Sequence, residues 1–386
     1  MRASLAVRDD AYRIVQDVNL VPVGRRAAGG SESKIGVATG TDHPDGGRGG
    51  HRVHQGDVGD GIERPPAAGG RRCVRREGDV ELGGVTTAPS GRRRVDLDPL
   101  SRAAPSITVE TMETEALAWP NGARLAVMVT VMFEAWPEGK APPYSPMASP
   151  LREGTVDRLG ISWADYAGKT GIWRLLRMLD QRGIQGTVAA NARAVERFPE
   201  AANEIVRRGH EIAGHGYTQD RLMPYYTPAE ERELIGKCAD IIAQATGARP
   251  VGWASPRMTP TEHTAALLAE RGFIWHGDYH DTDRPYVVST AKGRIVALQH
   301  SDFTDNRVLR ASPRDFFQVY QDTFDFLYRT EPASIINLTV HAHFGARPPL
   351  AAMLAAVLEY MQRHAGVWFA RHDEVAAWVM KQGAAR

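Results

Sequence analysis

The residues best suited to chemistry in this sequence are carboxylate and imidazole side chains placed at the ends of apolar, strand-like runs. A carboxylate beside imidazoles can activate water, hold a divalent metal ion or transfer a proton near neutral pH. One such histidine alone is typical of a structural residue, whereas several at one place indicate a catalytic or metal site. The candidates are Glu134, His215, His276, Asp278, His280, His341 and His343.

These side chains meet only if the chain folds into alternating strands and helices. Apolar, β-branched runs predict strands at 124–133, 187–191, 210–217, 251–255, 273–279, 294–298, 335–341 and 367–370. Helical spacing predicts helices at 173–179, 199–208, 228–246, 261–271, 312–328 and 350–364. Such alternation predicts an α/β fold whose parallel sheet closes as a barrel, with active residues at the carboxyl ends of the strands.

The composition is that of an ordinary soluble protein. Lys and Arg number 47 against 46 Asp and Glu, and 42% of the residues are hydrophobic, so collagen-like and acidic disordered classes are excluded and nucleic-acid binding is not expected. Cys73 and Cys238 are too few for a disulfide framework or a cysteine-based zinc site. No apolar run approaches the roughly 18 residues of a membrane span. With no secretory signal recognised, we expect a cytoplasmic protein without membrane contact.

Residues 1–111 differ from the rest of the chain. They are rich in Gly and Arg, and Tyr12 is their only aromatic residue, so they cannot bury enough apolar surface to offset the entropy of ordering. We expect a disordered N-terminal extension, with a basic arm for an anionic partner as an alternative. Another interpretation is that the natural chain begins at Met112. The catalytic domain is expected at 112–386.

Several motifs resemble one enzyme family. GHEIAGHGYTQ (209–219), the pair Ser255-Pro256 and LTVHAHFGARP (338–348) resemble the polysaccharide deacetylase (NodB-homology) superfamily. That resemblance implies a distorted (β/α)7 barrel of parallel strands. GIWRLL (171–176) and the DRPY run at 283–286 further resemble the branch of cyclic imide hydrolases and allantoinase-like proteins.

The resemblance implies a metal-dependent mechanism, from which this sequence departs twice. Family deacetylases use two aspartates after the first strand, but here only Glu134 is present, and Met132 or Ala135 fills the place of the other carboxylate. Gln219 replaces the second histidine of the metal pair, of which His215 is the first. A divalent metal, most simply zinc, is expected on Glu134, His215 and Gln219 or a histidine of 276–280. The alternative is that Glu134 and His215 orient water without metal.

The resemblance assigns His341 as the general acid and leaves the substrate contacts to the loops. The Pro-rich segment 135–150 is expected to fold over the barrel mouth as a lid, and a closed aromatic pocket suits a small flat ring. The expected substrate-binding residues are Trp136, Tyr144, Ser255, Asp278, His280, Asp283 and Arg347.

The predicted activity is hydrolysis of a carbon–nitrogen bond in a small cyclic imide or ureide, with Glu134 and His341 as catalytic residues. The alternatives are a carbohydrate N-deacetylase, of the peptidoglycan or chitin type, and a barrel that only binds a ligand or partner. The expected partner is the small cyclic amide itself, and the chain is a candidate homo-oligomer because barrels of this branch commonly assemble.

Overall fold

The computed structural model describes residues 108–110, 117–308 and 312–384, and their main feature is one ten-stranded sheet. Eight of its strands run parallel: seven follow the order β9-β2-β3-β4-β5-β6-β8, and the eighth, β10 (Val367–Phe369), pairs with β2. The seven are β2 (Leu125–Phe133), β3 (Thr187–Ala190), β4 (Glu211–Gly214), β5 (Gly252–Trp253), β6 (Trp275–Tyr279), β8 (Gly293–Gln299) and β9 (Ser334–His341). Among the described residues no backbone pairing closes the ring between β8 and β9. The predicted distorted (β/α)7 barrel is confirmed.

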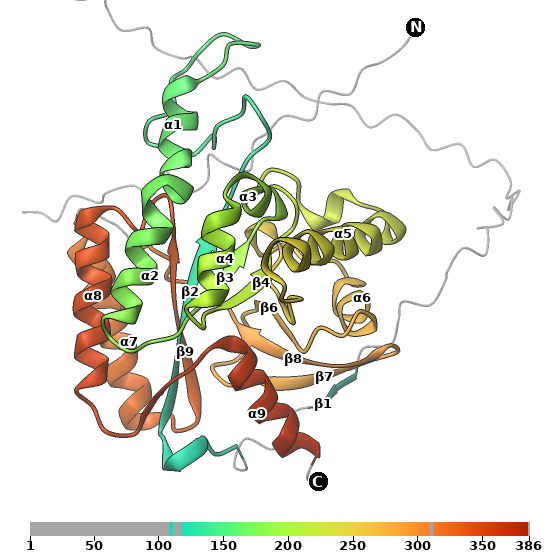
Figure 1. Cartoon of the computed structure of the whole chain (residues 1–386). Helices are drawn as coiled ribbons and strands as arrows, with labels where there is room; N and C mark the ends of the chain where they lie inside the picture. The colour runs from blue at the N-terminus through green and yellow to red at the C-terminus, as the bar shows by residue number, and fades with distance from the viewer. Residues whose placement is uncertain (1–107, 111–116, 309–311, 385–386) are drawn as a thin grey trace, which may run out of the picture. The chain divides into compact units, whose positions relative to one another are not determined.

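Nine helices are described, and most follow a strand and cover the sheet (Figure 1). They are α1 (Arg158–Tyr166), α2 (Ile172–Asp180), α3 (Ala192–Arg197), α4 (Pro199–Arg207), α5 (Pro228–Thr246), α6 (Thr264–Glu270), α7 (Arg314–Thr330), α8 (Pro348–Gln362) and α9 (His372–Ala384). A short π-helical segment, Ala167–Gly171, joins α1 to α2. No described helix has the length and apolarity needed to cross a membrane.

Local chemistry explains the best-predicted elements. Every residue of β2 is buried, as expected for an apolar strand with neighbours on both sides and layers on both faces. In α5, Thr227 and Glu230 form the predicted capping box, and Gly247 ends the helix in the left-handed conformation at φ 71°. Cys238 is fully buried on α5, and burial raises the pKa of its thiol to about 12, as expected for a packed thiol.

Two strands were not predicted, β7 and β1. β7 (Tyr286–Thr290) forms an antiparallel hairpin with β8, whereas the strand predicted at 367–370 is present as β10 (Val367–Phe369) and pairs with the first part of β2. β1 (Thr108–Glu110) pairs with β7, so the last residues of the segment expected to be disordered form a strand. The rest of 1–111, with Cys73, lies outside the described residues.

Candidate active site

The strand register places one layer of residues at the carboxyl edge of the barrel. The last residues of β2, β3 and β4 are Phe133, Ala190 and Gly214. Phe133 pairs with Ala190, and Ala190 pairs with Gly214, so the three strands end at one level. The next residue of each strand, Glu134, Asn191 and His215, therefore lies at the same level, and the backbone bond from Asn191 N to Phe133 O (3.1 Å) continues the ladder. Parallel strands collect side chains at one edge in this way.

Glu134 is the centre of a cluster of three histidines. Its Oε1 lies 3.6 Å from His215 Nε2 and 3.7 Å from His341 Nε2, while its Oε2 lies 3.8 Å from His343 Nδ1. Glu134 is 3% exposed, and neither Glu134 Oε1 nor His215 Nε2 has a hydrogen-bond partner among the residues that the structure describes. The structure thus brings together both predicted catalytic residues, Glu134 and His341, and His215, which with Glu134 was predicted to bind metal. We call these four side chains the Glu134 centre.

Asp305 orients the predicted acid and was not identified from the sequence. Its Oδ1 accepts a hydrogen bond from His341 Nδ1 (2.6 Å), and its Oδ2 accepts one from the His341 backbone N–H (2.7 Å). This pair directs His341 Nε2 toward Glu134. Asp305 lies in the irregular segment after β8, where neither periodicity nor a motif marks it, and its only signal is a carboxylate in a polar run.

Electrostatics fix the charges in the centre. Burial lowers the pKa of His341, but the charges of Asp305 and Glu134 outweigh it and raise that pKa to about 9. Burial raises the pKa of Glu134. The charge of His341 and the facing His215 outweigh burial and lower that pKa to about 2. Burial lowers the pKa of His343 to about 4. Near neutral pH the centre therefore holds a Glu134 carboxylate, a His341 imidazolium and a neutral His343.

His215 is held with one nitrogen toward Glu134. Its Nδ1 lies 2.7 Å from the Ala254 carbonyl oxygen, which only accepts, so Nδ1 carries a proton, and in the corresponding neutral tautomer Nε2 bears the lone pair. Asn191, also missed from the sequence, accepts from the Ala135 backbone N–H (2.9 Å) and donates to the His215 carbonyl oxygen. It therefore ties the loop that carries Glu134 to the one that carries His215.

An aromatic cover lies over the centre. The ring centroids of Trp163, Trp136 and Tyr144 are 4.9, 5.4 and 6.4 Å from that of His343, and Tyr144 Oη lies 3.4 Å from Glu134 Oε2. Trp136 and Tyr144 come from the Pro-rich segment predicted to be a lid, and Trp163 comes from α1. The described cover thus closes the centre with apolar rings.

The residues present supply only part of a zinc site. Glu134 Oε1 and His215 Nε2 face each other, and Gln219 Oε1 is also buried without a partner. However, in the described part of the chain no three His, Cys, Asp or Glu side chains converge as metal ligands. The third predicted ligand is a neutral amide, which binds zinc weakly, and a protonated His341 shares Glu134 Oε1. The set does not fit the predicted zinc site.

Three other predicted substrate contacts have protein partners. Asp278 bonds the Ser255 backbone N–H (2.8 Å) and His276 Nε2 (2.7 Å), while Ser255 Oγ accepts from the Trp253 indole (3.1 Å). His280 Nδ1 lies 3.1 Å from Asp302. Asp278 and Ser255 thus support the edge beside Ala254 and His215.

The Arg347 guanidinium donates hydrogen bonds to backbone carbonyl oxygens beside the Glu134 centre. It donates to the carbonyl oxygens of His343 (3.1 Å) and Trp163 (3.2 Å), and it lies 4.3 Å from the Tyr166 ring centroid. This residue connects α1 to the turn after β9, so its predicted contact with substrate stays a prediction.

The placement of Asp283 in the site is wrong. Its carbonyl oxygen accepts from the Ile335 backbone N–H (2.9 Å), at the amino end of β9. Ile335 precedes His341 by six residues of extended strand, roughly 20 Å at 3.3 Å per residue. The segment after β6 turns back along the sheet to begin β7 and does not stay at the carboxyl edge.

A (β/α)7 barrel with a buried carboxylate and imidazoles at the carboxyl edge of its strands is an arrangement suited to a hydrolase. Comparisons with known proteins identify the family. The sequence model of the polysaccharide deacetylase family matches residues 155–274. A probable polysaccharide deacetylase from Pseudomonas aeruginosa PAO1, solved by crystallography, is 31% identical over 68% of this chain and 93% of its own, with a TM-score of 0.61. The chain belongs to the polysaccharide deacetylase family.

Two further relatives differ in what they are named for. The crystal structure of a PuuE allantoinase is 29% identical, with a TM-score of 0.60, over 67% of this chain and 91% of its own. A peptidoglycan deacetylase of Helicobacter pylori is 26% identical over 58% of this chain and 88% of its own. Deacetylases of this family typically depend on a divalent metal. Both relatives are hydrolases of carbon–nitrogen bonds other than peptide bonds, and this chain is a hydrolase of that class.

Proposed function

We propose that the protein opens the ring of a small cyclic imide or ureide by adding water to a ring carbonyl. The observation that carries this proposal is the enclosure of the Glu134 centre: Glu134 and His215 are 3% and 0% exposed beneath the aromatic cover. A flat ring stacks on such side chains, whereas a polymer needs an open groove. The similarity to a structure named as an allantoinase supports the same proposal, because allantoin is a cyclic ureide.

In the proposed mechanism, Glu134 and His215 position the attacking water. Glu134 Oε1 and the lone pair of His215 Nε2 are two acceptors 3.6 Å apart. A water that donates one hydrogen to each presents its own lone pairs to the substrate carbonyl. As the oxygen attacks, Glu134 accepts a proton, which makes it the general base.

His341 then protonates the ring nitrogen as the carbon–nitrogen bond breaks. Its imidazolium charge is the main favourable cause of the low pKa of Glu134, so loss of that proton stabilises the protonated form in which the attack leaves Glu134. An imide then gives a carboxylic acid and an amide on one chain, a half-amide, and a cyclic ureide gives the corresponding ureido acid. The separation of 3.7 Å between Glu134 Oε1 and His341 Nε2 lets the proton return to His341.

A carbohydrate N-deacetylase is the second candidate, because the Helicobacter pylori relative bears that name. The deciding experiment offers the full chain succinimide, maleimide, hydantoin, dihydrouracil and allantoin, and in parallel N-acetylglucosamine oligomers. Ring opening is followed by product chromatography and deacetylation by acetate release. We expect ring opening without acetate. Acetate release with intact rings would replace our proposal by the deacetylase.

A further inference from the structure

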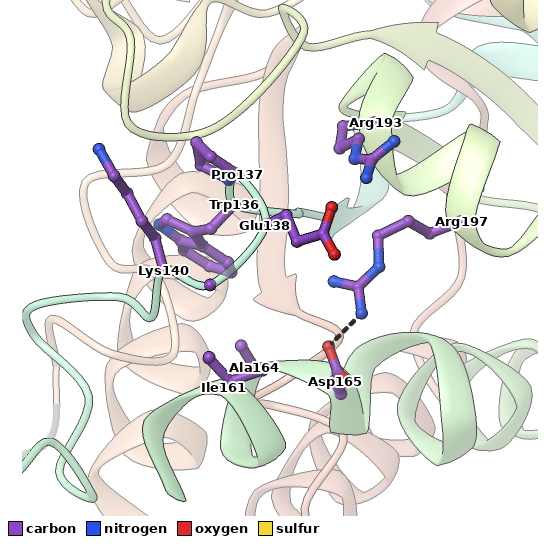
Figure 2. A pocket seen from close by; sticks show the side chains of 10 residues that line it. Trp136, Pro137, Glu138, Lys140, Ile161, Ala164, Asp165, Arg193 and Arg197 are labelled. Atoms are coloured by element: carbon purple, nitrogen blue, oxygen red, sulfur yellow. Dashed lines mark hydrogen bonds and ion pairs between the residues drawn. The ribbon is translucent and has the colours of Figure 1, made fainter. Parts of the chain in front are cut away.

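A cavity of about 210 Å³ lies beside the Glu134 centre, between the loop after β2 and the helices α1 and α3. Figure 2 shows its wall from α3, with Arg193 and Arg197, and the opposite loop, with Trp136 and Glu138. The volume equals that of about seven water molecules at roughly 30 Å³ each. It therefore suits a small organic molecule and not a polymer.

The α3 wall offers unused hydrogen-bond donors. Arg193 and Arg197 lie one helical turn apart, so their side chains leave α3 on the same side. The Arg193 guanidinium donates to Glu196 (3.2 Å) and the Arg197 guanidinium to Asp165 (2.8 Å), each through a single nitrogen. A guanidinium has several further N–H groups in a planar fork that matches a carboxylate.

The loop wall offers an acceptor. In Figure 2 the Glu138 carboxylate points across the cavity toward Arg193 and Arg197. In the described part of the chain it forms no ion pair within 4.0 Å and no hydrogen bond. Asp165, the other carboxylate of the lining, is already paired with Arg197 and with Lys169 (3.6 Å). Opposite walls therefore present free donors and a free acceptor.

Trp136 separates this cavity from the reacting groups. It lines the cavity and is 5% exposed, and its ring is 5.4 Å from that of His343, whose Nδ1 lies 3.8 Å from Glu134 Oε2. A molecule in the cavity is thus one indole away from the Glu134 centre. The indole also supplies an apolar surface for a short carbon chain.

We propose that this cavity is a second site, which binds the half-amide that ring opening releases. Its carboxylate pairs with Arg193 and Arg197, its carboxamide N–H donates to Glu138, and its carbon chain lies against Trp136. The inference rests on the proposed function, because only ring opening of a cyclic imide or ureide yields an acid and an amide on one short chain. Deacetylation would yield acetate, which lacks the amide.

The test measures binding without turnover, by calorimetry on the full chain. The probes are succinamate, its neutral diamide succinamide, its diacid succinate, and acetate. We expect succinamate to bind most tightly, and Arg193→Gln and Arg197→Gln each to weaken it about tenfold, as for a lost hydrogen bond to a charged group. Arg207→Gln, an exposed arginine on α4 paired with Glu204, should leave binding unchanged.

A fourth variant excludes misfolding as the explanation. Glu138→Gln removes the charge that repels a second carboxylate, so succinate should bind more tightly than to the wild type and the preference for succinamate should shrink. Three results would overturn the inference: no binding of succinamate, binding of succinamate by Arg193→Gln and Arg197→Gln as tight as by the wild type, or an affinity for succinamide equal to that for succinamate. Ring opening without succinamate binding would refute this site alone, whereas succinamate binding without ring opening would refute the proposed function alone.

Discussion

At the residue scale, the activity depends on opposite charges held within one buried cluster. Glu134 retains its carboxylate chiefly through the charge of His341, and His341 retains its proton through the charges of Asp305 and then Glu134. Neither residue would have its charge fixed in this way if it were buried alone. The catalytic groups are therefore a network, and the sequence revealed only part of it.

The pH dependence follows from the pKa of His341, which is raised to about 9. The acid form is present below that pH and is lost above it, so kcat/KM for succinimide, corrected for spontaneous hydrolysis, should be flat from roughly pH 5 to 8 and fall above about 9. Asp305→Asn removes a cause of the raised pKa and should move the alkaline limb to lower pH.

Asp302→Asn is the matched control, because Asp302 pairs with His280 and not with His341. It should leave the alkaline limb in place. An alkaline limb that stays at the same pH in Asp305→Asn would show that His341 is not the group that titrates.

At the element scale, close packing of the first and last parts of the barrel positions the centre. Gly171, at the junction of the π-helical segment and α2, lies against the backbone of Ala342, between His341 and His343. A Cβ on Gly171 would overlap the Ala342 carbonyl oxygen. Only glycine permits this approach, so α2 sets the position of the turn that carries both histidines.

Gly171→Ala should therefore disturb both stability and activity. We expect a loss of about 1–3 kcal/mol in the free energy of unfolding, as for other overpacked sites, together with a lower kcat from displaced histidines. Chemical denaturation and steady-state kinetics measure the two effects. Lys169→Ala, an exposed change in the same π-helical segment, is the control. Wild-type stability and kcat in Gly171→Ala would contradict this role for the glycine.

At the scale of the whole molecule, most of the barrel could be predicted because its buried strands are continuous apolar runs with clear helix signals between them. The predicted β2, α5 and β9 lie within one or two residues of the structure. β7 was missed because only the second strand of its hairpin with β8 was recognised, and Asp283 was misplaced because the direction of that hairpin is not encoded in strand patterns.

The site was predicted less completely than the barrel, because strand patterns locate only residues at strand ends. Glu134, His215 and His341 lie at strand ends, so the strand register brings them together. Asp305 and Asn191 are brought in by a loop and a helix start, whose paths depend on tertiary contacts. The expected zinc rested on resemblance, and the donor set of the assembled site does not support it.

Metal removal tests that last point on the whole protein. Because Glu134, His215 and Gln219 do not make a complete zinc site, we expect ring opening to continue within about twofold after dialysis against a strong chelator, and added zinc not to raise it. Metal analysis of the dialysed protein checks that removal was complete. Activity that is lost on chelation and restored by zinc would mean that these residues do hold a metal.

The central claim is that Glu134 and His341 together open a cyclic amide, and steady-state ring opening of succinimide by Glu134→Gln and His341→Ala tests it most directly. Positioned proton transfer contributes typically about 10²- to 10⁴-fold, so each variant should lose kcat by that factor, with melting temperatures near that of the wild type. Glu233→Gln, an exposed change on α5, should behave as wild type. Unchanged turnover in both folded variants would contradict the claim.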